Sequence, residues 1–154
     1  MAQDGHREVM QPHRYTELFF LDEATAFAAG HRPCAECRRP DFSRFMEAWA
    51  AGNPEWVPEK RGLRVGDVDE VLHGERVMRS RQQVTFESRV EELPDGVLVA
   101  RTHVAWLLHR NQLRRWTPSG YLESVDADPE KTVTVLTPRS IVRSFQAGYI
   151  PTFD

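Results

Sequence analysis

The sequence predicts an α+β fold, in which a helical N-terminal part with a Cys-x-x-Cys turn precedes a small antiparallel β region with a C-terminal helix. Apolar residues recur at helical spacing between residues 42 and 49, and short β-rich runs separated by turn residues begin at residue 84. The chain has 154 residues, 40% of them hydrophobic, which is enough to bury the core of one ordinary domain.

The first segments are expected to form an arm, a strand and a short helix. Residues 1–12 are polar and have no clear period, so we interpret them as a loop or an arm. The aromatic and aliphatic run over 15–21 is short enough for a strand, and Asp22 is a favourable N-cap for a helix over 23–29. Gly30 then supplies the position at which a helix can end in a left-handed turn.

The clearest helix begins at Pro40-Asp41. Its apolar positions lie at i, i+3, i+4 and i+7 and indicate a face that packs in the core, namely Phe42, Phe45, Met46 and Trp49. The helix ends at Gly52, and the prolines and charged residues that follow indicate a connector. We therefore expect a first module over 1–52, a connector over 53–66 and a β-rich region with a C-terminal helix over 67–154, either as separate parts or as one compact unit.

Beyond the connector, the sequence predicts a short helix over 67–78 and then five or six strands at hairpin spacing. The β-rich runs cover 84–93, 97–100, 103–109, 113–116, 121–125 and 132–136. Together they predict a small antiparallel sheet or partial barrel. Thr137 can cap a final helix that has Pro138 at its first position and runs to residue 146 or 147.

Net charge and hydropathy narrow the class of protein. The net charge is only −3, so a nucleic-acid partner has to be argued from local basic patches rather than from the charge of the whole chain. No apolar run approaches the roughly 18 to 20 residues that cross a bilayer, and the N-terminal residues lack the apolar stretch of a secretory signal. We expect no membrane partner and a cytoplasmic protein.

The two cysteines, Cys34 and Cys37, are spaced as metal ligands usually are. Such a turn lets two thiolates reach one zinc ion at about 2.3 Å, but a closed structural site needs four ligands. The others would come from a histidine, with His31, His6 and His13 the nearest, or from a carboxylate, water or a second chain that shares the ion. A redox pair and two reduced, packed thiols are the alternatives, and the spacing alone does not choose.

The residues around this turn resemble the second, downstream half of the N-terminal zinc domain of the Ada family, the bacterial methylphosphotriester repair proteins. In that family an aromatic strand and the pattern Ala-(Leu/Phe)-Ala-Ala-Gly-aromatic-Arg-Pro-Cys-x-x-Cys lead into a helix. The stretch from Phe19 to Asp41 is similar, and the run from Ala28 to Cys37 matches well, with His31 where an aromatic residue is usual. The resemblance covers about residues 15–45, and it implies that the first module is an Ada-like metal-binding knuckle with two helices.

The resemblance implies a zinc site of four cysteines, in which Cys34 and Cys37 match the downstream pair. In the family, a thiolate of the upstream pair takes a methyl group from a DNA phosphate triester. The region near residues 2–8 has no cysteine here, so either His6 substitutes for one ligand or the chain has lost its beginning through a late start. The methyl acceptor has no counterpart in either case, and we do not expect methyl transfer.

Arginines surround the cysteine turn and make it a candidate phosphate-binding surface. Guanidinium groups bind phosphate oxygens bidentately, and a turn fixed by a metal would present them together. The residues concerned are Arg32, Arg38, Arg39 and Arg44. The alternative is a solvated face on which these arginines pair with Glu36, Asp41 and Glu47.

A second basic group lies in the β region, where Arg114 and Arg115 stand close to Trp116 and Tyr121. Basic residues beside aromatic rings can grip a nucleic-acid backbone and stack bases. Core aromatics beside a solvated turn are the alternative interpretation, and the one we favour.

Histidines near carboxylates or in apolar runs are further candidates for chemistry. His73 and Glu75 could act as general base or metal ligand, but residues two apart on a helix diverge, so we interpret both as exposed helix surface. His103 and His109 are six apart, which on a strand places them on one face, and we interpret them as ordinary partly buried histidines.

These observations favour a zinc-stabilised nucleic-acid-binding protein without methyl-transfer activity. Cys34 and Cys37 would anchor the turn, and the arginines would contact the phosphates of DNA or RNA. Two alternatives stay open: a small zinc- or thiol-dependent enzyme of unknown substrate, and a non-catalytic protein-interaction domain. A homo-oligomer is conceivable through a shared metal site.

Overall fold

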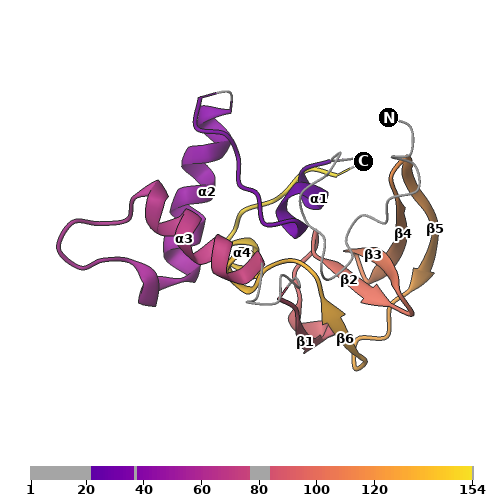
Figure 1. Cartoon of the computed structure of the whole chain (residues 1–154). Helices are drawn as coiled ribbons and strands as arrows, with labels where there is room; N and C mark the ends of the chain where they lie inside the picture. The colour runs from indigo at the N-terminus through magenta and orange to yellow at the C-terminus, as the bar shows by residue number, and fades with distance from the viewer. Residues whose placement is uncertain (1–21, 37, 77–83, 154) are drawn as a thin grey trace.

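The computed structural model describes residues 22–36, 38–76 and 84–153 (Figure 1). The first half of the chain forms α1 (Glu23–Ala28), α2 (Arg39–Gly52), the 3₁₀ helix η2 (Pro54–Trp56) and α3 (Val65–Arg76). The second half forms β1 (Phe86–Arg89), the 3₁₀ helix η3 (Val90–Glu92), β2 (Leu98–Arg101), β3 (Val104–His109), β4 (Gln112–Thr117), β5 (Gly120–Asp126), β6 (Thr132–Val135) and α4 (Arg139–Gln146). Helices and strands thus occupy separate stretches of the chain, which confirms the predicted α+β class.

The strands form one six-stranded sheet in the order β1-β6-β2-β3-β4-β5, and each neighbouring pair is antiparallel. The predicted antiparallel β region is therefore confirmed. The strand expected over 84–93 is shorter than predicted, because it ends at Arg89 and the chain turns into η3. The strand expected over 15–21 lies outside the described residues.

Helices α2, α3 and α4 gather on one side of the molecule, the sheet occupies the other, and α1 lies between them (Figure 1). The largest core cluster draws residues from the helices and the sheet alike, among them Phe27, Phe45, Trp49, Val99, Val135 and Ile141. Helices α2 and α4 approach so closely that a side chain at Gly52 would collide with the backbone carbonyl of Arg143. Residues on both sides of the predicted connector thus share a core, and the division into domains stays a prediction.

The start and the end of α1 follow the sequence signals. The Asp22 carboxylate accepts hydrogen bonds from the backbone N–H and the hydroxyl of Thr25, at 2.9 and 2.7 Å, as an N-cap does. Gly30 follows the last residues of the helix with φ of 86°, a left-handed conformation that glycine adopts without steric cost. Both predictions for this helix are confirmed.

Two tight turns join β2 to β3 and β3 to β4. Both central residues have positive φ in each turn, 47° and 65° at Thr102-His103 and 52° and 65° at Arg110-Asn111. This left-handed pair matches the right-handed twist of the flanking strands. His103 therefore lies in a turn and is exposed, so the prediction that it shares a strand face with His109 is wrong.

The cap of α4 comes from a distant helix rather than from Thr137. The Glu75 carboxylate of α3 accepts hydrogen bonds from the Ser140 backbone N–H at 3.0 Å and from its hydroxyl at 2.6 Å. The Thr137 hydroxyl instead accepts the backbone N–H of Leu98 on β2, at 3.0 Å. The predicted Thr137 cap is therefore wrong, and so is the interpretation of Glu75 as exposed helix surface.

Helix α3 begins at Val65, two residues before its predicted start, and its described part ends at Arg76. None of the helices in the described ranges combines the length and the apolar character that crossing a bilayer requires.

Candidate functional site

The segment between α1 and α2, residues 30–38, forms the Cys34 turn. Pro33 is buried, while Cys34 is exposed at the head of the turn. The backbone N–H of Arg38 closes the turn by donating to the carbonyl of Cys34 at 3.1 Å, and α2 begins at the next residue. Cys37 and His6, two of the predicted zinc ligands, lie outside the described residues.

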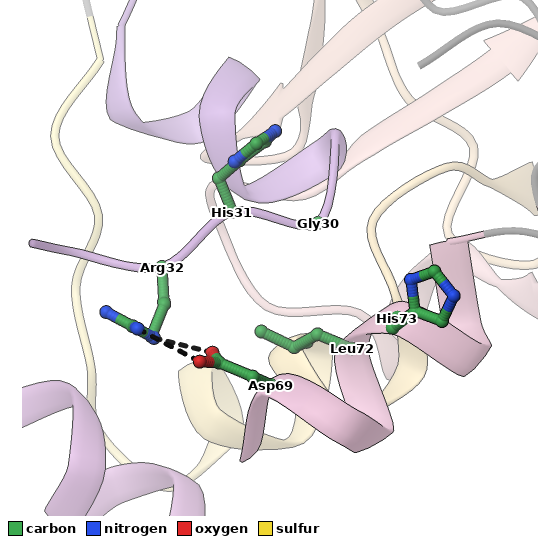
Figure 2. A pocket seen from close by; sticks show the side chains of 6 residues that line it. All are labelled: Gly30, His31, Arg32, Asp69, Leu72 and His73. Carbon is green, nitrogen blue, oxygen red and sulfur yellow. Dashed lines mark hydrogen bonds and ion pairs between the residues drawn. The ribbon is translucent and has the colours of Figure 1, made fainter. Parts of the chain in front are cut away.

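Arg32 ties the upstream side of the Cys34 turn to α3. Its Nε and Nη2 atoms donate to the two carboxylate oxygens of Asp69, at 2.7 and 3.1 Å (Figure 2). Its guanidinium carbon also lies 5.6 Å from the centre of the Phe42 ring on α2. The hydrogen bond to Asp69 raises the pKa of Arg32, and the charges of Asp69 and Cys34 act in the same direction. The Arg32 guanidinium is therefore held between α2 and α3.

Arg38 ties the downstream side of the turn to the start of α1. Its Nη2 atom donates to Glu23 at 2.7 Å, and the guanidinium also pairs with Asp41 in the first turn of α2. Glu23 is almost fully buried, and it also accepts hydrogen bonds from the hydroxyl of Tyr149 at 2.7 Å and from the backbone N–H of Thr152 at 2.9 Å. Burial and the bond to Glu23 raise the pKa of Tyr149 above its usual range. One carboxylate thus joins α1, the start of α2 and the C-terminal segment.

A polar cavity of about 280 Å³ lies between the Cys34 turn and α3, lined by Gly30, His31, Arg32, Asp69, Leu72 and His73. In Figure 2 the rings of His31 and His73 both point away from the Arg32–Asp69 pair, and His73 lies on a later turn of α3. Within the described ranges, no three histidine, cysteine or acidic side chains are grouped so that they could hold a metal ion. The described residues therefore do not supply a complete ligand set.

The four arginines near the turn differ in what they contact. Arg32 and Arg38 are the tethers just described, and Arg44 pairs with Asp41. Arg39 is exposed and makes no ion pair with the residues that the structure describes. Of the three predicted carboxylate partners, Asp41 is paired with arginines, whereas no ion pair to Glu36 or Glu47 forms in the described part of the chain.

The second basic group is divided between the two faces of the sheet. Arg114 and Arg115 are consecutive on β4 and so point to opposite faces. An Nη2 atom of Arg114 lies 3.1 Å from Nδ1 of His109, and Arg115 pairs with Glu123 at 3.6 Å. Burial, together with the charge of Arg114, lowers the pKa of His109.

The aromatic residues of this second group attach α1 to the sheet. Trp116 is buried and donates its indole N–H to the Thr25 hydroxyl at 3.1 Å, and Tyr121 donates its hydroxyl to Asp22 at 2.8 Å. This supports the interpretation of these rings as structural rather than as a surface for stacking bases. Sequence reasoning gave no role to Glu23 or Tyr149, because these two residues lie 126 positions apart in the chain and no local pattern marks their contact.

We found no match between this chain and a protein-family model, a curated protein or a solved structure.

Proposed function

We propose that this protein is a zinc-stabilised nucleic-acid-binding protein in which Cys34 and Cys37 supply two thiolate ligands. The observation that supports this is the placement of Cys34, exposed on a turn that ion pairs tie down on both sides. A ligand on a fixed turn loses less conformational freedom when a metal binds. The proposal retains the resemblance to the downstream half of the Ada zinc knuckle and excludes methyl transfer.

The chemistry of the turn suits zinc. Thiolates are preferred zinc ligands, and a nearby guanidinium stabilises a thiolate over a thiol. Arg32 stands two residues before Cys34 in the same turn and would have this effect. His31, His6 or a second chain would complete the coordination.

The start of α2 is the part of the turn best suited to contact phosphate. No side chain caps this helix, so the backbone N–H groups of Arg39 and Asp41 have no capping side chain, and Pro40 between them has no N–H. Such N–H groups and the helix dipole favour an anion, and the exposed Arg39 adds a positive charge there. Arg32, Arg38 and Arg44 would contribute mainly by neutralising acidic neighbours and fixing the turn. Arg114 and Arg115 lie on β4 and would act as a separate surface.

The test is binding of labelled single- and double-stranded oligonucleotides, measured by fluorescence anisotropy at several salt concentrations. We expect Arg39→Ala to weaken binding about 3- to 10-fold and to lower the salt slope by about one. Arg64→Ala is the matched control, because Arg64 is exposed as well but precedes α3. No binding at low salt, or the same loss in both variants, would refute the proposal.

A further inference from the structure

Ile150 is an exposed apolar side chain on a fixed backbone. It is 83% exposed, far more than an isoleucine in a folded domain usually is. The residues on either side are held, because Tyr149 and the Thr152 N–H both bond to Glu23, and the Thr152 carbonyl accepts the N–H of Ala24 at 3.1 Å. Ile150 is therefore pre-organised as an anchor for a partner surface, with little backbone freedom left to lose on binding.

An apolar groove lies beside Ile150. It has a volume of about 370 Å³ and runs between α2 and the segment after α4, and the residues that line it include Arg44, Glu47, Ala48, Ala51, Gly148 and Ile150. Small side chains leave the groove open, and Arg44 and Glu47 stand one turn apart on the same face of α2. One face thus carries a protruding isoleucine, a hollow next to it and two opposite charges.

We propose that the occupant of this groove is the same face of a second copy of the chain. A two-fold interface requires a surface that is complementary to itself. This face carries both partners of each contact, namely an apolar anchor with a groove and a positive charge with a negative one. An antiparallel crossing of two α2 helices brings Arg44 of each chain to Glu47 of the other. Ile150 of each chain then enters the groove of its partner.

The charge pattern favours a second copy over an unrelated partner. Glu47 has no ion pair within the described part of the chain, so the interface would give it an opposite charge. Arg44 is exposed and already shares Asp41 with Arg38, which leaves its remaining N–H donors for a second carboxylate. A peptide from another protein would have to supply both charges and the apolar anchor itself.

The experiment is sedimentation equilibrium of the purified full chain between roughly 1 and 500 µM. We expect a species of twice the 17.8 kDa chain mass that dissociates on dilution. Ile150→Asp should raise the dissociation constant at least about tenfold, because the anchor is lost. Leu122→Asp is the matched control: Leu122 is 57% exposed on the edge strand β5, away from the groove, and its replacement should leave the dimer unchanged.

Charge reversal tests the pairing of the two helices. Glu47→Arg alone should weaken the dimer about 3- to 10-fold, and combining it with Arg44→Glu should restore most of the affinity. A wild-type chain that is monomeric throughout, or a dimer that Ile150→Asp leaves intact, would overturn the proposal. So would a dimer lost on chelation or in Cys34→Ser but not in Ile150→Asp, since the chains would then share a metal ion instead.

Discussion

The two ends of α1 use the same kinds of charged residue for different purposes. At the N-terminal end, Asp22 and the buried Glu23 accept hydrogen bonds from the sheet, from Arg38 and from the C-terminal segment. At the other end, the Arg32–Asp69 pair is partly exposed, with side-chain exposures of 24% and 49%, and holds only the Cys34 turn. Burial decides the difference: the first end contributes to global stability, and the second positions an exposed thiol.

Removal of the buried carboxylate should have the largest effect. We expect Glu23→Ala to lower the free energy of unfolding by about 2 to 4 kcal/mol, because the Tyr149 hydroxyl and the Thr152 N–H lose their acceptor. Urea unfolding measures this change. Glu36→Ala, at an exposed position of the Cys34 turn, is the control and should change stability by less than about 0.5 kcal/mol. Equal losses of stability in the two variants would contradict the claim that the N-terminal end of α1 contributes more to global stability than the Cys34 turn does.

Glu75 is a partly buried carboxyl that joins α3 to α4. Its burial should make the stability of the protein depend on pH. Burial raises the pKa of Glu75 above its ordinary 4.5, although the bonds from Ser140 oppose the shift. The folded chain therefore keeps this proton at pH values where the unfolded chain has lost it, so the contribution of Glu75 to stability falls as pH rises from about 4.5 through the raised pKa.

Glu75→Gln should lack this decline. Urea unfolding at about pH 4.5 and about pH 7 should show the variant gaining stability relative to wild type at the higher pH. Glu70→Gln, at an exposed position of the same helix, provides the comparison and should show no such gain. A stability difference between Glu75→Gln and wild type that does not change with pH would contradict this account.

The smallest effect on stability should come from the exposed tether. Arg32→Ala should change the free energy of unfolding by at most about 1 kcal/mol, because solvent screens the pair with Asp69. We expect the same substitution to weaken zinc binding roughly tenfold, because it loosens the turn that carries Cys34. Competition with a chromophoric chelator measures this affinity.

Arg61→Ala is the control for Arg32→Ala in the zinc-binding experiment. It tests whether the loss of affinity depends on the place of the arginine or only on the loss of a positive charge. Arg61 forms a similar exposed pair with both carboxylate oxygens of Asp67, at 2.9 and 2.7 Å, at the start of α3. Its loss should leave zinc affinity unchanged. If both variants lost zinc to the same degree, the role of Arg32 as a specific tether would be refuted.

Local features of the fold could be predicted from the sequence. The apolar spacing over 42–49 and the Asp22 cap specify α2 and the start of α1, because the partners lie within one or two turns. The strands and their antiparallel pairing follow from short β-rich runs between turn residues.

Contacts between distant residues could not be predicted in the same way. The Glu75 cap on α4 spans 65 residues, so no local pattern marks it, whereas Thr137 has the sequence position of a cap. The tethers of the Cys34 turn are also non-local: Arg32 meets Asp69 across 37 residues. Spacing therefore located the turn but did not distinguish the arginines that hold it from those that remain exposed.

The central claim is that the Cys34 turn binds zinc, and the most direct test is the zinc content of the purified protein by elemental analysis. We expect about one zinc per chain in the wild type, falling close to zero in Cys34→Ser while urea unfolding shows that the variant remains folded. No zinc in the wild type, or an unchanged amount in Cys34→Ser, would contradict the account.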